Sequence, residues 1–251
     1  MRCAGSRWRA SRPKSCWRSG GGEAVRVPSV GVLSLQGDFA RHRASLEALG
    51  ARVVRVSLPG HLEGLDALVL PGGESTTMLR LLELTGLRAP LETFARCRPV
   101  LGTCAGVILL GRDSGELPAP PLGVLDIAVE RNAYGRQVDS FSTPVETAVA
   151  PGFHGVFIRA PRIRRVGPGV EVVARRAADG EPVGVRAGRA VGLCFHPELT
   201  PDLGFHRWFL AEVAGLALPG APPRAAAGMW PGDARAGLDG EPAAAGSRGA
   251  R

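Results

Sequence analysis

Cys104 stands in the pentapeptide Gly-Thr-Cys-Ala-Gly, residues 102–106, where one apolar run ends and another begins. A cysteine on a tight strand-to-helix turn with small neighbours is the cysteine form of the nucleophile elbow. The small neighbours allow a strained turn without collisions between strand and helix. The helix N-terminus that follows lowers the thiol pKa and offers backbone N–H groups to an oxyanion. The spacing predicts a nucleophile, although a buried structural cysteine with packing glycines would show the same pattern.

His196 and Glu198 lie in the stretch Phe-His-Pro-Glu-Leu-Thr, residues 195–200. Alternate residues of an extended strand point to the same side, so the two side chains are predicted to cooperate. In such a pair the carboxylate orients the imidazole and stabilises its cationic form. A lone His-Pro-Glu is typical of a surface turn. With Cys104 upstream, the chain order Cys, His, Glu predicts nucleophilic catalysis by a triad.

A third candidate is the loop around Gly72 and Gly73, which leaves an apolar run and opens a helical pattern. Such a loop exposes backbone N–H groups and could supply the second donor of an oxyanion hole. It is not a phosphate-binding P-loop, because the required lysine does not follow. An ordinary strand-to-helix turn is the alternative.

Alternating strands and helices must position these residues. Apolar strands that alternate with helices predict an α/β fold, with a parallel sheet covered on both faces. From residue 122 onward, strands joined by short turns replace this alternation. The predicted strands are 29–35, 51–57, 65–73, 98–104, 155–166, 170–176, 182–188 and 189–196, and the predicted helices are 38–50, 74–86, one beginning at 105, and 202–216.

Charge and composition exclude several classes of function. The chain of 251 residues has 31 Lys+Arg and 23 Asp+Glu, a net charge of +8, but residues 1–28 contribute seven basic residues against one acid. Residues 29–218 carry 20 arginines against 19 acids, so a nucleic-acid partner is not expected. No apolar run could span a bilayer, so no membrane partner is expected either. Lys14 is the only lysine, which excludes a lysine Schiff base in the predicted core.

The cysteine pattern bears on metals and on the cellular compartment. The cysteines are Cys3, Cys16, Cys97, Cys104 and Cys194. They form no C-x-x-C pair and no regular spacing, so neither a metal site nor a disulfide framework is predicted. An odd count without a secretory segment fits a reducing, cytoplasmic setting.

Two terminal segments differ from the rest of the chain. Residues 1–28 are rich in Arg, Ser, Gly and Trp, and residues 219–251 are of low complexity, so both are predicted to be disordered. The first segment is also compatible with a transit peptide or with a start assigned too far upstream, of which we favour the second. The remaining residues, 29–218, are predicted to form one domain.

Several motifs together resemble one protein family. They are LQGD (35–38), LPGGESTTM (70–78), GTCAG (102–106), ERNAYGRQVDSF (130–141), GVFIRAPRI (155–163) and FHPELT (195–200). Together they resemble the glutaminase subunits of pyridoxal 5'-phosphate synthase, which are triad class I glutamine amidotransferases. The resemblance covers residues 29–215. It implies a three-layer, flavodoxin-like class I glutamine amidotransferase fold around a central mixed, mostly parallel sheet.

The resemblance also implies roles for individual residues. Cys104 would be the nucleophile, His196 the general base and acid, and Glu198 the residue that orients His196. The backbone N–H groups of Gly73 and Ala105 would form the oxyanion hole. The glutamine site would be lined by Gly73, Glu74, Ser75, Arg131, Ile158 and Arg159. Independently of the resemblance, an arginine fork suits the carboxylate of an amino-acid substrate.

The implied reaction is hydrolysis of L-glutamine to glutamate and ammonia, with no cofactor and no metal. The implied partner is a (β/α)8-barrel synthase subunit, in a large hetero-oligomer, that uses the ammonia to make pyridoxal 5'-phosphate. Two alternatives stay open at this point. The chain could serve a different synthase, or it could be a non-catalytic docking subunit.

Overall fold

The computed structural model describes residues 26–131, 133 and 140–218. Most of the two segments predicted to be disordered, and most of the motif at 130–141, lie outside the described residues. In the described part of the chain, no helix is long and apolar enough to cross a membrane.

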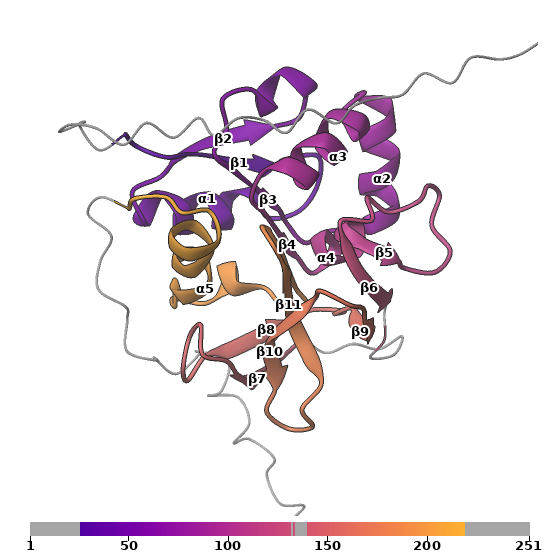
Figure 1. The fold of residues 1–251 in the computed structure, drawn as a ribbon, viewed down its shortest axis with the longest axis vertical. Coiled ribbons are helices and arrows are strands. Elements are labelled where there is room, and N and C mark those ends of the chain that lie inside the picture. The colour runs from indigo at the N-terminus through magenta and orange to yellow at the C-terminus, as the bar shows by residue number, and fades with distance from the viewer. Residues whose placement is uncertain (1–25, 132, 134–139, 219–251) are drawn as a thin grey trace, which may run out of the picture.

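A large mixed sheet forms the centre of the fold (Figure 1). Its nine strands have the order β2-β1-β3-β4-β12-β11-β10-β7-β8. The strands from β2 to β12 pair in parallel, and the other neighbours pair antiparallel. The strands are β1 (Ser29–Leu33), β2 (Arg52–Val56), β3 (Ala67–Leu70), β4 (Val100–Thr103), β7 (Phe141–Glu146), β8 (His154–Phe157), β10 (Glu171–Arg176), β11 (Pro182–Ala187) and β12 (Ala190–Leu193).

The parallel half has the flavodoxin-like order, in which the chain reverses direction across the sheet between β1 and β3. Every residue of β1, β3, β4 and β12 is buried, as expected for strands covered on both faces. The predicted α/β fold with a mixed sheet is confirmed, and its antiparallel part is as extensive as its parallel part.

Helices cover both faces of the parallel strands (Figure 1). Helices α1 and α5 lie on one side, and α2, α3 and α4 lie on the other. Their bounds are α1 (Phe39–Ala48), α2 (Ser75–Leu84), α3 (Arg88–Cys97), α4 (Ala105–Leu110) and α5 (Gly204–Trp208), which continues as a π-helix, η3 (Phe209–Val213). Short 3-10 helices are η1 (Pro59–Leu62) and η2 (Pro197–Leu199).

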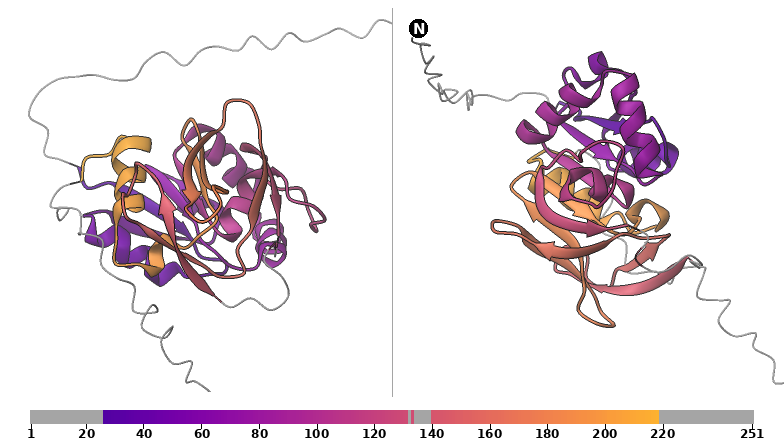
Figure 2. Two further views of the ribbon diagram at one scale, coloured as in Figure 1. Left: turned by 90° about the horizontal axis from the view of Figure 1, so that it is seen from below. Right: turned by 90° about the vertical axis from the view of Figure 1, so that its right-hand side faces the viewer.

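The antiparallel half projects beyond the helical layers as a curved sheet (Figure 2). A second, three-stranded sheet has the order β5-β6-β9. Its strands are β5 (Gly111–Asp113), β6 (Leu125–Glu130) and β9 (Arg162–Val166). Four phenylalanines in contact, Phe153, Phe157, Phe195 and Phe205, fill the space between the antiparallel strands and α5.

Two local expectations were wrong. The strand predicted for 189–196 ends at Leu193, and His196 instead precedes the 3-10 helix η2. The segment 155–166 is not one strand, because it bends sharply at Arg159, whose φ is +44°. Helix α3, whose apolar face packs against η1 and α2, was not among the helices predicted from the sequence.

Candidate active site

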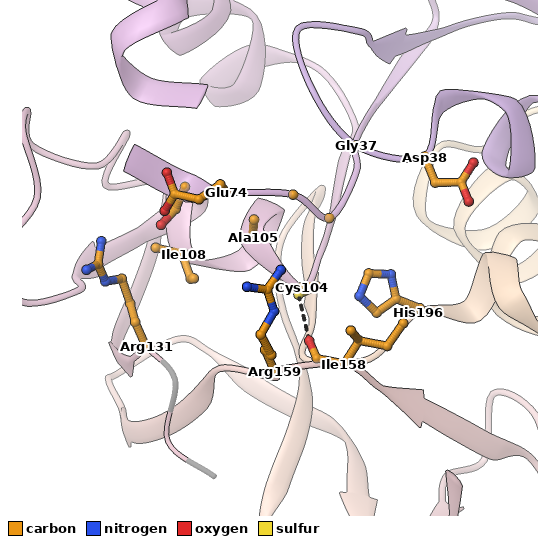
Figure 3. Close-up of a pocket in the computed structure, with 13 residues that line it drawn as sticks. Gly37, Asp38, Glu74, Cys104, Ala105, Ile108, Arg131, Ile158, Arg159 and His196 are labelled. Carbon is orange, nitrogen blue, oxygen red and sulfur yellow. Dashed lines mark hydrogen bonds between the residues drawn. The ribbon is translucent and has the colours of Figure 1, made fainter. Parts of the chain in front are cut away.

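One pocket opens where the parallel strands reach their carboxyl ends. In a parallel sheet these ends lie along one edge, which is where α/β proteins bind ligands. Residues that follow β1, β3, β4 and β12 all line it (Figure 3). The full lining is Gly37, Asp38, Gly72, Gly73, Glu74, Ser75, Cys104, Ala105, Ile108, Arg131, Ile158, Arg159 and His196. Its volume of about 260 Å³ suits a small metabolite.

The structure therefore brings together all the predicted site residues except Glu198, which lies behind His196. Gly37, Asp38 and Ile108 also line the pocket, although they were not predicted from the sequence. The signal for Gly37 and Asp38 was present, because their motif directly follows the first strand, and the carboxyl ends of parallel strands converge.

Cys104 has a backbone conformation that side chains rarely adopt, with φ +49° and ψ −106°. Its N–H donates to the Leu193 carbonyl at 2.8 Å, which ties the turn to the neighbouring strand β12. The side chain is only 7% exposed, so it forms part of the buried lining of the pocket. A strained, buried turn directly before a helix is the backbone geometry of a nucleophile elbow.

The flanking glycines are required by close backbone packing. A Cβ on Gly102 would lie 2.6 Å from the backbone of Gly106, and a Cβ on Gly106 would lie 2.1 Å from the Leu70 carbonyl oxygen. Neither distance is possible for real Cβ atoms. The elbow therefore needs glycine at both positions so that α4 can sit directly on β3 and β4.

His196 is held between Glu198 and Cys104. Its Nδ1 lies 2.7 Å from Glu198 Oε1, and on the other side the ring lies beside Cys104, whose thiol donates to the Ile158 carbonyl at 3.8 Å (Figure 3). Burial alone would lower the pKa of His196. The hydrogen bonds and negative charges of Cys104 and Glu198 outweigh this effect and raise the pKa to about 10. The imidazole is thus stabilised in its protonated form at neutral pH.

The route by which Glu198 meets His196 differs from the predicted one. The two residues were expected to share one side of an extended strand. Instead, the chain turns into η2 at Pro197, and this turn folds Glu198 back under the imidazole. Burial would raise the pKa of Glu198, but His42 and His196 beside it keep the pKa well below its usual range.

Glu74 has a structural role that its sequence motif did not indicate. Its carboxylate is the N-cap of α2 and accepts from the backbone N–H groups of Thr76 and Thr77 at 3.2 and 2.7 Å. Partial burial would raise its pKa, but the hydrogen bonds from these two threonines lower it to about 2. Glu74 therefore keeps a negative charge at the mouth of the pocket.

Two arginines bring positive charge to the same pocket (Figure 3). Within the described residues, neither Arg131 nor Arg159 has an ion-pair partner, and Nη1 of Arg131 is buried without a hydrogen-bond partner. An arginine without an ion-pair partner can bind the carboxylate of a ligand. Among the described residues, no group of three or more His, Cys, Asp or Glu side chains could hold a metal ion.

The described cysteines differ strongly in environment. Cys194 is fully buried, and burial raises the pKa of its thiol far above the usual range. Cys97 is exposed at the end of α3, and Cys104 alone among these three lines the pocket. The geometry is thus that of a cysteine nucleophile with an acid–base partner and an orienting carboxylate.

The sequence pattern of the SNO glutamine amidotransferase family matches residues 32–215. The chain belongs to this family. A curated relative from Deinococcus radiodurans, named pyridoxal 5'-phosphate synthase subunit PdxT, is 52% identical over 189 residues, which cover 72% of this chain and 95% of the relative. A relative of the same name from Thermotoga neapolitana is 48% identical and is covered to 98%, with 73% of this chain aligned.

Solved structures agree with this membership of the SNO family. A crystal structure described as a glutamine amidotransferase is 48% identical, with a TM-score of 0.69, and the match covers 74% of this chain and 99% of that one. A structure of PurLQS from Thermotoga maritima has a TM-score of 0.54 at 20% identity, covering 74% of this chain and 98% of that one. The second likeness, at this low identity, concerns the fold alone.

Proposed function

We propose that this SNO-family chain hydrolyses the side-chain amide of L-glutamine and supplies the ammonia to pyridoxal 5'-phosphate synthase. The observation that carries the proposal is the strained Cys104 elbow, which shares one pocket with His196, itself paired with Glu198 behind it. The relatives named PdxT support the choice of synthase, because they align over nearly their whole length.

In the proposed reaction, the thiol proton of Cys104 already lies on His196, and the Cys104 thiolate attacks the amide carbon. The backbone N–H groups of Gly73 and Ala105 stabilise the oxyanion that forms. His196 then gives its proton to the nitrogen as the C–N bond breaks, so ammonia leaves and a γ-glutamyl thioester remains. Water activated by His196 cleaves the thioester to glutamate and restores the thiol. The raised pKa of His196 suits the step in which it holds the proton.

Charge in the pocket supports an amino-acid substrate. The substrate carboxylate would pair with Arg131 or Arg159, whose guanidinium groups have no ion-pair partner among the described residues. The negative charge of Glu74 lies in the same pocket and suits the substrate ammonium. Gly73, Ser75 and Ile158 would complete the glutamine site.

The ammonia requires a partner because, free in water at neutral pH, it becomes ammonium, which is not a nucleophile. The proposed partner is a (β/α)8-barrel synthase subunit in a hetero-oligomer, and a channel between the subunits would keep the ammonia unprotonated. Lysine imine chemistry would belong to that partner, since the described part of this chain contains no lysine.

The Gly72–Gly73 peptide gives a means of coupling the two subunits. Gly73 has a φ of +156°, and glycine peptides rotate at low steric cost. One rotation would turn the Gly73 N–H away from or toward the oxyanion. A missing oxyanion donor costs about a hundred- to a thousandfold in rate, so hydrolysis should be weak in the isolated chain and rise when the synthase subunit docks.

The test compares glutamate release by the full chain with and without a saturating pyridoxal phosphate synthase subunit, at fixed glutamine. Cys104→Ala should abolish release in both conditions, and a glutamine-derived chloroketone should modify Cys104. Cys97 serves as the internal control, since it is an exposed thiol outside the pocket. Turnover that is equal in both conditions would exclude the coupling, and modification mainly at Cys97 would overturn the assignment of the nucleophile.

A further inference from the structure

Behind the pocket, four buried polar side chains form a cluster that we call the buried histidine cluster. Its members are His42 from α1, Thr103 from β4, Glu198 from η2 and His206 from α5. His42, Thr103 and His206 have no exposed surface, and Glu198 is 4% exposed. Buried polar groups are costly unless they are paired, so a cluster of this kind needs an explanation.

His42 is the centre of this cluster. Its Nε2 lies 3.3 Å from Glu198 Oε2 and 3.2 Å from Thr103 Oγ1, while its Nδ1 lies 3.1 Å from His206 Nε2. The other carboxylate oxygen of Glu198 holds His196. His42 therefore contacts the acid of the triad and also the residue that directly precedes Cys104.

His42 hydrogen-bonds to Thr103 Oγ1 through Nε2 and to His206 Nε2 through Nδ1. Its approach to Glu198 Oε2 at 3.3 Å is an electrostatic contact without hydrogen-bond geometry, and that oxygen is buried without a hydrogen-bond partner among the described residues. Nδ1 of His206 is likewise buried without a hydrogen-bond partner among the described residues.

We infer that His42 is a positioning residue for the triad. It fixes the Glu198 carboxylate relative to the end of β4, directly before Cys104. This arrangement keeps His196 facing the thiol. The inference rests on the proposed glutaminase function. His42 does not line the pocket, so it acts through Glu198 and not on the substrate. The titratable groups that face it are Glu198 from η2 and His206 from α5, and β4 contributes the uncharged Thr103.

Three substitutions separate the contacts of His42. His42→Gln places an amide nitrogen near the Nε2 position and can keep the contact with Glu198. His42→Asn places one near the Nδ1 position and can keep only the contact with His206, and His42→Leu removes both. We expect kcat to fall about ten- to a hundredfold in His42→Asn and His42→Leu, as for loss of a polar contact with a buried carboxylate, with KM for glutamine unchanged. His42→Gln should stay within about threefold of the wild type, because the contact with Glu198 is kept.

The pH dependence of kcat/KM gives a second measurement. It would not change if His42 had only a structural role. Without the His42 ring 3.3 Å from Oε2, the carboxyl of Glu198 should protonate at higher pH. The acidic limb of kcat/KM should then shift toward neutral pH in His42→Leu and stay in place in His42→Gln. The measurement uses the full chain with saturating synthase subunit, and circular dichroism checks that each variant is folded. If His42→Leu does not fold, the comparison of His42→Asn with His42→Gln decides.

These experiments distinguish a failure of the inference about His42 from a failure of the proposed glutaminase function. A wild-type chain that releases no glutamate refutes the proposed function, and the inference is then tested by the rate at which iodoacetamide modifies Cys104 across pH. That profile should shift in His42→Asn but not in His42→Gln. An active wild type, together with an unchanged kcat and pH profile in His42→Asn and His42→Leu, overturns the inference. Equal losses in the Asn and Gln variants also overturn it, because the contact with Glu198 would then not matter.

Discussion

The geometry of the pocket depends on close contacts between backbone and side-chain atoms. Gly72 shows this most clearly, because a Cβ added there would lie 2.3 Å from Cε1 of His196 and 3.2 Å from Cβ of Cys104. There is therefore no room for a side chain between its backbone and the side chains of His196 and Cys104. The backbone of Gly72 fixes the space in which the imidazole and the thiol meet, in addition to any role of the next peptide in the oxyanion hole.

Gly72→Ala should consequently impair catalysis more than folding. The added methyl group must push the His196 ring away from Cys104, and a misplacement of about 1 Å costs about a hundredfold in rate. We expect kcat to fall by at least this factor, with little change in the thermal midpoint. Gly60→Ala is the matched control, because nothing lies within 4 Å of a Cβ at that position. Unchanged turnover in Gly72→Ala would show that the imidazole can shift without loss.

At the scale of elements, the apolar strands and the elbow could be predicted because their signals are local. Four-residue runs such as β3 and β4 are buried throughout, and the small residues around Cys104 reflect backbone contact. The buried histidine cluster joins four separate elements. It could not be predicted, because a local sequence pattern does not indicate which distant elements pack together. His42 did carry one signal, since it shares the buried face of α1 with Leu46, four residues later.

Glu74 illustrates how an element can change the meaning of a residue. The family resemblance implies that Glu74 binds substrate, whereas in the structure its carboxylate caps the N-terminus of α2. Glu74→Ala should lower the free energy of unfolding by about 1 kcal/mol, the usual cost of losing an N-cap, and Glu74→Ser should restore most of it. Urea unfolding measures this effect. If the carboxylate also contacts glutamine, KM rises in both variants, and equal stability of Glu74→Ala and the wild type would contradict the capping role.

At the scale of the whole molecule, buried ionisable groups link folding to pH in two opposite directions. The raised pKa of His196 contributes stability that is fully present below its unfolded pKa of about 6.5 and is lost as the pH rises toward 10. His206 behaves in the opposite way. Burial and, next, the charge of His42 lower its pKa to about 3, so its neutral form is the one that folds. Together the two residues place maximal stability near neutral pH.

The acidic side of this profile can be assigned to His206. Between pH 6.5 and pH 5 the unfolded chain binds a proton at His206 that the folded chain does not, so stability should fall by up to about 2 kcal/mol in this window. Carboxylates with lowered pKa values, such as Glu198, contribute only at lower pH, near and below their unfolded value of 4.5. Urea unfolding at several pH values should show that His206→Gln loses this slope, whatever its absolute stability, while His154→Gln, a change at an exposed histidine, keeps it. A slope that persists in His206→Gln would mean that another group takes up the proton, and His206 would then not control the acid stability of the fold.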